Sequence, residues 1–170
     1  MKIAFLDRDG TINKDYADHE WSNVKEPELI KGSIEGIQNL IGLGYQIIIV
    51  TNQYIINDGI ISFDDYERFT DKLLQIFMDN GIDVLDIFYC PNNDSDLCNC
   101  KKPKPGMILE ALSKYDIELE ESIYCGDSES DDLLARYFNL PFFGINYESE
   151  TCLSFKNLLE VSEYIKMNER

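Results

Sequence analysis

Short apolar runs alternate with amphipathic stretches along the whole chain, and no other feature limits its fold as strongly. The runs are rich in Ile, Val, Phe and Tyr and are bordered by Gly, Asp, Asn or Pro, which is typical of buried strands. They cover residues 2–6, 45–50, 84–89, 122–125 and 141–145. Apolar side chains at helical spacing predict helices over residues 33–43, 62–80, 105–114, 131–138 and 154–165. This alternation predicts a parallel sheet with helices on both faces, a three-layer α/β fold in one domain over residues 1–170.

The composition narrows the possible partners. Of the 170 residues, 44% are hydrophobic, which suffices for a core and argues against disorder. The chain carries 32 acidic and 15 basic residues, a formal charge of −17, which argues against binding to nucleic acid or an anionic membrane. A small phosphorylated substrate stays compatible, because it needs only a local positive site. No apolar run suits a secretory signal or a membrane span, so we expect a cytoplasmic protein; its oligomeric state is open, with a monomer favoured.

Polar side chains follow the first predicted strand at once. Asp7 and Asp9 are two residues apart and so share one face of an extended chain, and Gly10 lets the backbone turn away. Two carboxylates held together repel unless a cation lies between them, and a divalent metal is a natural partner. The alternative is a polar loop start with an Asx turn.

Three further segments carry chemistry at predicted loop positions. Thr51 and Asn52 end the second strand and offer hydroxyl and amide donors to an anion, or form an ordinary turn. Lys101 and Lys102 open a basic Lys-Lys-Pro-Lys-Pro-Gly segment that suits phosphate, or is a solvated charge run. An acidic segment that starts at Asp127 follows the fourth strand, where it completes a metal site or provides first-turn acids for a helix.

The order of these segments resembles the four motifs of the haloacid dehalogenase (HAD) superfamily. The motifs are strand-Asp-x-Asp-Gly-Thr, strand-Thr-Asn, Lys-Pro and strand-Gly-Asp-x(3)-Asp, and the resemblance covers residues 2–145. It implies a Rossmann-like HAD fold, and the short spacing after Thr11 and after Gln53 implies that there is no large cap domain.

The resemblance also implies a phosphatase mechanism. Asp7 matches the nucleophile that forms an aspartyl-phosphate, and Asp9 matches the general acid and base. Thr51 and Asn52 match phosphoryl-binding positions, and Lys102 matches the lysine that stabilises the nucleophile and the transferred charge.

A magnesium ion belongs to the same resemblance. Its expected ligands are Asp7, the backbone carbonyl of Asp9, and Asp127, and Asp131 is expected to orient metal-bound water. The ion screens the two anions that must meet, the carboxylate and the phosphate.

Within the superfamily, the chain resembles the capless branch of histidinol-phosphate and D-glycero-D-manno-heptose 1,7-bisphosphate phosphatases. The segments Asp-Arg-Asp-Gly-Thr-Ile-Asn, Thr-Asn-Gln and Cys-x-Cys-Lys-Lys-Pro-Lys-Pro-Gly-Met carry this likeness, and residues 104–107 favour the heptose enzymes. Lys101 stands where that branch carries an Arg that reaches the substrate, and Asp58 stands at a second Arg position, with reversed charge.

Other functions stay open beside the heptose phosphatase. Histidinol phosphate or another small phosphate ester is the main alternative, and a phosphotransferase remains possible if an acceptor replaces water. The negative charge argues against a polynucleotide 3′-phosphatase. The presence of Asp7 and Asp127 argues against a non-catalytic binding protein on the same fold.

Three of the five cysteines, Cys90, Cys98 and Cys100, lie close together. Without an export signal, we favour a metal cluster or reduced thiols over a disulfide. The related enzymes bind structural zinc through Cys-x-His and Cys-x-Cys, but here Asn92 replaces the His, and Asn is a poor zinc ligand.

The segment from Asp15 to Lys25 is unusual for a loop because it contains Tyr16, His19 and Trp21. Its aromatic side chains are expected to anchor the loop to the core or, alternatively, to contact a substrate. The sequence leaves its role open.

Overall fold

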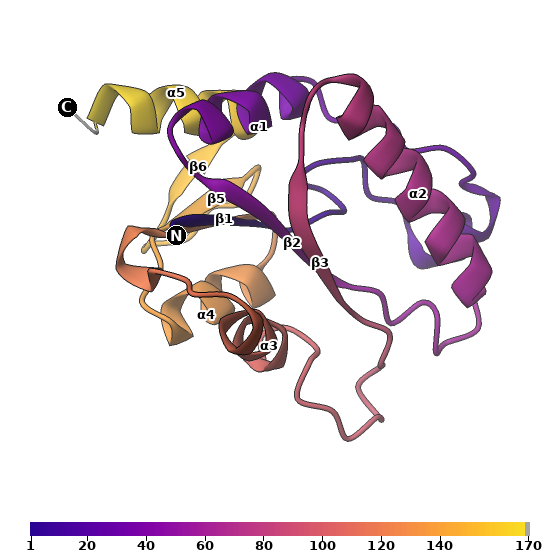
Figure 1. The fold of residues 1–170 in the computed structure, drawn as a ribbon. Coiled ribbons are helices and arrows are strands. Elements are labelled where there is room, and N and C mark those ends of the chain that lie inside the picture. Colours follow the sequence, from indigo (N-terminus) through magenta and orange to yellow (C-terminus); the bar gives the residue numbers. More distant parts are fainter. Residues whose placement is uncertain (169–170) are drawn as a thin grey trace.

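The computed structural model, which describes residues 1–168, contains a six-stranded sheet in which every pair of neighbouring strands is parallel (Figure 1). The strand order is β3-β2-β1-β4-β5-β6. The strands are β1 (Ile3–Leu6), β2 (Gln46–Asn52), β3 (Val84–Cys90), β4 (Ile123–Gly126), β5 (Phe142–Ile145) and β6 (Leu153–Phe155). The predicted parallel α/β fold and its first five strands are confirmed.

Helices cover both faces of the sheet (Figure 1). They are α1 (Ser33–Gly42), α2 (Phe63–Asp79), α3 (Gly106–Lys114), α4 (Glu129–Tyr137) and α5 (Leu158–Asn168), with short 3-10 helices η1 (Asp18–Asn23) and η2 (Leu119–Glu121). One prediction is wrong: residues 154–165 do not form one helix. The short edge strand β6 takes up Ser154 and Phe155, because Phe155 packs against the core beside Phe143 of β5. Helix α5 therefore begins only at Leu158.

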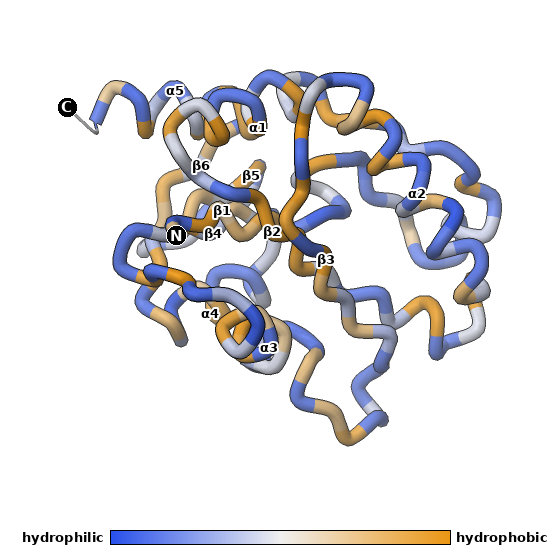
Figure 2. Tube along the Cα trace, in the orientation of Figure 1, coloured by the Kyte–Doolittle hydropathy of each residue, from blue (hydrophilic) through white to orange (hydrophobic). Residues whose placement is uncertain are grey.

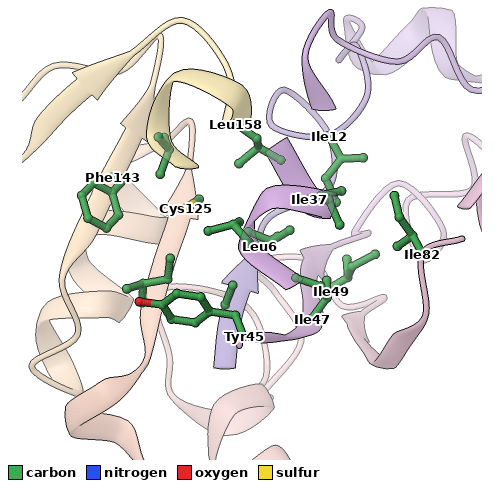
Figure 3. Close-up of a cluster of buried hydrophobic side chains, with 14 of the residues drawn as sticks. Leu6, Ile12, Ile37, Tyr45, Ile47, Ile49, Ile82, Cys125, Phe143 and Leu158 are labelled. Atoms are coloured by element: carbon green, nitrogen blue, oxygen red, sulfur yellow. The ribbon is translucent and has the colours of Figure 1, made fainter. Parts of the chain in front are cut away.

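Two apolar layers fix the helices to the sheet. Side chains of α1, α2 and α5 pack on one face, in the cluster that includes Leu6, Ile37 and Leu158 (Figure 3). Side chains of α3 and α4 pack on the other face, against Phe5 and Tyr124. The hydrophobic stretches of the central strands run between these layers (Figure 2). Such burial on both faces explains why the central strands read as continuous apolar runs.

The central strand β1 sets the position of the site. In the register of the sheet, Leu6 lies beside Ile49 of β2 and Cys125 of β4, and the Asp7 amide donates to the Cys125 carbonyl at 2.9 Å. The polar residues that follow these three strands therefore meet at one edge, where ligands bind in open parallel sheets. The long segments 13–31 and 91–104 leave the sheet at the same edge. Among residues 1–168, no helix has the length and apolar character that crossing a membrane requires.

Candidate active site

A buried ammonium group holds two buried carboxylates at the centre of the site. Lys102 Nζ donates to Asp7 Oδ1 and to Asp131 Oδ1, each at 2.7 Å, and to the Val50 carbonyl at 2.9 Å. Asp131 also accepts from the Tyr124 hydroxyl at 2.9 Å. These contacts join the ends of β1, β2 and β4 to the loop before α3, so residues far apart in the sequence form one network.

Burial and charge shift the titration of this network. Burial raises the pKa of Asp7 well above its usual value; the Lys102 charge opposes this rise, and the charges of Asp131 and Asp127 add to it. Burial, followed by the charge of Asp131, raises the pKa of Asp127 to about 7. Burial favours the neutral amine of Lys102, but the charges of Asp131 and Asp7 outweigh it and raise the Lys102 pKa. Lys102 therefore stays charged.

The same acids fit a divalent cation. Asp7, Asp127 and Asp131 each place a carboxylate oxygen within 4.8 Å of the others. Three acids face one lysine, and burial and mutual repulsion raise the pKa of Asp7 and Asp127; a hard cation with oxygen ligands would relieve both effects and favour the ionised forms. Asp131 is already committed to Lys102, Tyr124 and Ser128, which leaves Asp7 and Asp127 as the available ligands.

Gly10 makes this close approach possible. Its φ angle is +89°, and a Cβ atom built there meets Asp127 Oδ2 at 1.9 Å. A side chain at this position would therefore collide with the carboxylate that faces Asp7 across the site.

Asp9 lies in a separate set of contacts. Arg8 Nε and Nη2 donate to its two carboxylate oxygens, each at 2.8 Å. Asn13 Nδ2 donates to Asp9 Oδ1 at 2.9 Å, and Gln53 Nε2 donates to Asp9 Oδ2 at 2.7 Å. Both oxygens of Asp9 are therefore held by protein donors beside the cavity.

The remaining predicted residues lie around the cavity in different roles. Thr51 is buried, lines the cavity and accepts from Gln53 Nε2 at 2.8 Å. Asn52 also lines it, but its side chain accepts from the Lys102 amide at 2.9 Å and donates to the Lys102 carbonyl at 3.2 Å. Asn52 thus holds the lysine-bearing backbone. Lys101 does not line the cavity: its Nζ pairs with Asp94 at 2.6 Å and lies 4.6 Å from the Tyr54 ring centre.

The cavity has a volume of about 200 Å³ and one wall from the segment 13–31. Trp21 lines it while only 5% exposed, and its ring packs edge-on against Phe69 of α2. The loop aromatic is therefore an anchor that also borders the cavity. Asp15 and Asp18 line the same wall, and burial raises the pKa of Asp15.

The cysteine segment differs from expectation. Cys90 and Cys100 form a disulfide, with Cα atoms 5.5 Å apart, whereas a metal cluster or reduced thiols was favoured. Their spacing suits the bond because the chain after β3 folds back toward α3. Cys98 is free, 3.8 Å from Cys90 Sγ, and Asn92 Nδ2 donates to Cys100 Sγ at 3.2 Å. The three Sγ atoms nevertheless lie within 4.8 Å of one another, so in reduced form Cys90, Cys98 and Cys100 would offer three thiolates to a metal, while Asn92 adds no good fourth ligand.

Sequence reasoning missed several residues of the site. Arg8, Asn13 and Gln53 hold Asp9, and Tyr124 and Ser128 hold Asp131. Arg8, Asn13 and Gln53 lie inside the motif segments Asp-Arg-Asp-Gly-Thr-Ile-Asn and Thr-Asn-Gln, which is the one signal that pointed to them. Nothing in the local pattern marked Tyr124, because a tyrosine in an apolar strand is indistinguishable from core.

The arrangement is that of a HAD-type phosphatase site. It combines an Asp-x-Asp pair after the central strand, a buried lysine, and a further aspartate after the neighbouring strand β4. The chain matches the polynucleotide kinase 3 phosphatase family over residues 2–140 and belongs to this family. It is therefore a phosphatase of the HAD superfamily, as the order of its motifs predicted.

Individual relatives are also named as phosphatases. The chain is 40% identical over 138 residues to a D-glycero-alpha-D-manno-heptose-1,7-bisphosphate 7-phosphatase of Photorhabdus laumondii, with 77% of this chain and 74% of the relative covered. It is 38% identical to a D-glycero-beta-D-manno-heptose-1,7-bisphosphate 7-phosphatase of Helicobacter pylori, with 97% of each covered. The crystal structure of D,D-heptose 1,7-bisphosphate phosphatase from B. bronchiseptica with magnesium and phosphate superposes with a TM-score of 0.87 at 26% identity, covering 99% of both chains.

Proposed function

We propose that this protein is a Mg²⁺-dependent phosphatase that hydrolyses D-glycero-D-manno-heptose 1,7-bisphosphate at the 7-position. The observation that carries the proposal is the cluster of buried Asp7, Asp131 and Lys102 with half-buried Asp127, in which three acids face one lysine. The substrate is the one named for the relatives, and relatives of both anomeric series match, so the proposal leaves the anomer open.

Each side chain takes a role that its position allows. Asp7 Oδ2 is not held by Lys102 and attacks phosphorus, forming an aspartyl-phosphate that water then hydrolyses. Once the leaving oxygen replaces Gln53 Nε2 at Asp9 Oδ2, protonated Asp9 gives its proton to that oxygen, and the resulting carboxylate later takes a proton from the water. Thr51 holds a phosphoryl oxygen, and Lys102 stabilises the charge on Asp7 and on the transferred group.

Magnesium would be held by Asp7, the Asp9 carbonyl and Asp127, with Asp131 orienting its water. When bound, it screens the phosphate from the nucleophile and stabilises the charge that develops on the phosphoryl oxygens. Zinc at the cysteine segment is not part of this proposal, since Asn92 is a poor fourth ligand beside Cys90, Cys98 and Cys100.

Histidinol phosphate is the second candidate, favoured by one observation. Asp15 and Asp18 place acids on the cavity wall, and Lys102, the one cation that lines this cavity among the described residues, is already paired. A substrate whose far end carries an amine suits such a wall better than one with a second phosphate.

The test is phosphate release with Mg²⁺ from heptose 1,7-bisphosphate, histidinol phosphate and a 3′-phosphorylated oligonucleotide, with Asp7→Asn as the blank. We expect the highest kcat/KM for the heptose, and no release from any substrate by the blank. Release by Asp7→Asn at the wild-type rate would refute the mechanism, and a preference for the oligonucleotide would refute the substrate.

A further inference from the structure

The guanidinium of Arg8 is buried in a box of aromatic rings. Arg8 is 2% exposed, and its Cζ lies 4.7 Å from the ring centre of Phe69, 5.7 Å from that of Tyr66 and 5.8 Å from that of Trp21. Phe69 and Tyr66 belong to α2, and Trp21 belongs to η1. Aromatic faces attract a guanidinium and leave it little freedom to turn, so the box fixes the plane of the group.

The fixed guanidinium in turn fixes the plane of the Asp9 carboxylate. Two parallel N–H donors reach both oxygens, each at 2.8 Å, and this fork geometry defines orientation as well as distance. Asn13 and Gln53 add one donor to each oxygen. We call Arg8, Asn13 and Gln53 the Asp9 cradle.

The cradle leaves buried polar atoms without partners. Arg8 Nη1, Asn13 Oδ1 and Gln53 Oε1 have no hydrogen-bond partner within the described chain, and with Thr70 Oγ1 they are the four such buried side-chain atoms found there. A buried polar atom without a partner destabilises a fold, and three of the four belong to the cradle. A group of side chains selected for stability alone would not concentrate this cost around one carboxylate.

We propose that Arg8 is a positioning residue for Asp9. Through it, η1 and α2 set the orientation of the carboxylate that acts as general acid and base, although neither element contributes a group to the chemistry itself. The inference rests on the proposed function, because it needs Asp9 to act on the leaving oxygen. By this inference, the rings of Trp21, Tyr66 and Phe69 orient Asp9 through Arg8, in addition to packing against one another.

A double-mutant cycle tests whether Arg8 acts through Asp9. Arg8→Lys keeps the charge and loses the fork, and phenyl phosphate serves as the probe substrate because its leaving group gains from protonation by Asp9, while Asp9→Asn is expected to retain measurable activity on it. We expect Arg8→Lys to lower kcat at least about tenfold with little change in KM, since general acid–base catalysis contributes about 10²–10⁴-fold and depends on geometry. In the Asp9→Asn background, the same substitution should change kcat by less than about twofold.

Arg136 provides the matched control. It forms the same type of fork with Asp132 on α4, at 2.8 and 2.5 Å, and takes no part in the site. Arg136→Lys is expected to leave kcat unchanged. If Arg8→Lys does not fold by circular dichroism, Phe69→Leu replaces it, because this variant removes the ring nearest the Arg8 guanidinium and leaves every donor to Asp9 in place.

The outcomes separate the two proposals. Wild-type activity that persists in Asp7→Asn overturns the proposed function and this inference with it. Activity that depends on Asp7 but is unaffected by Arg8→Lys overturns the inference alone. An equal loss in the wild-type and Asp9→Asn backgrounds also overturns it, since Arg8 would then act on the fold rather than on Asp9.

Discussion

Lys102 Nζ lies 2.7 Å from Asp131 Oδ1 and at the same distance from Asp7 Oδ1, so one ammonium group neutralises two carboxylates in the interior of the protein. Asp7 is the proposed nucleophile, whereas Asp131 is held by three protein donors. Asp131 therefore fixes the ammonium in place, and the second oxygen of Asp7 accepts only a longer bond, 3.3 Å, from the Thr11 hydroxyl among the described residues.

Replacing Lys102 by Met should destabilise the protein as well as inactivate it. The substitution leaves Asp7 and Asp131 buried without their cation, and breaking a buried ion pair in this way costs about 3–5 kcal/mol. Urea denaturation measures the free energy of unfolding. Lys104→Met is the control, because Lys104 Nζ is exposed and contacts only the Cys98 carbonyl among the described residues. A loss below about 1 kcal/mol in Lys102→Met would contradict this account.

Gly10→Ala should weaken magnesium binding. A Cβ at residue 10 meets Asp127 Oδ2 at 1.9 Å, so the carboxylate must move away from Asp7. Gly59→Ala is the matched control, since Gly59 also has a positive φ angle, +74°, but nothing within 4 Å of a built Cβ. We expect the Mg²⁺ concentration for half-maximal activity to rise at least about tenfold in Gly10→Ala beyond any change in Gly59→Ala. Equal changes in both would attribute the effect to backbone strain.

The stabilisation by Mg²⁺ should grow as pH rises through 7. Burial and Asp131 raise the pKa of Asp127 to about 7, so without metal its contribution to stability is full below the unfolded value near pH 4 and is lost as pH rises through 7. Magnesium binds the deprotonated form and reverses this loss. Its apparent affinity should be about tenfold weaker at pH 6 than at pH 8. Thermal unfolding with and without Mg²⁺ measures this, and a pH-independent shift would exclude Asp127 as a ligand.

Lys101 should affect substrate binding rather than turnover. Its Nζ pairs with Asp94 and lies against the ring of Tyr54, which lines the cavity, whereas Lys101 itself lies outside the cavity lining. Lys101→Ala is expected to raise KM for the bisphosphate several-fold, by about 1 kcal/mol of binding, with kcat within twofold. Asp94→Ala frees the lysine and should lower KM or leave it unchanged. A loss of kcat in Lys101→Ala would instead place this lysine in the chemical step.

The alternation of apolar runs predicted the parallel sheet because strands buried on both faces must be apolar throughout. Leu158 and Val161 lie on the buried face of α5, so helical spacing was correct there, but three residues of strand were too short for any period to reveal. The ends of β1, β2 and β4 were predictable as a common site because parallel strands bring their carboxyl ends to one edge.

The contact partners of the side chains within the site could not be predicted from the sequence. The motif predicted a phosphate-binding role for Asn52, and only the structure shows that its side-chain amide hydrogen-bonds the Lys102 backbone. Arg8 lies between two acids, and only the three-dimensional packing of Trp21, Tyr66 and Phe69 shows that its charge is buried. These partners lie 13 to 61 residues apart in the sequence, and no local spacing records which donor reaches which acceptor.

The groups that react and the residues that line the rest of the cavity belong to different parts of the fold, and this separation affects how such enzymes diversify. The reacting groups sit on strand ends whose register cannot shift without disrupting the core, and Lys102 is tied to them by Asn52 of β2. Asp15, Asp18 and Trp21, in contrast, form a wall of the cavity away from the reacting groups. A lineage can therefore acquire a new phosphate ester by remodelling this wall while inheriting its chemistry unchanged. Arg8 sets one limit on that freedom, because a change at Trp21 reaches Asp9 through it.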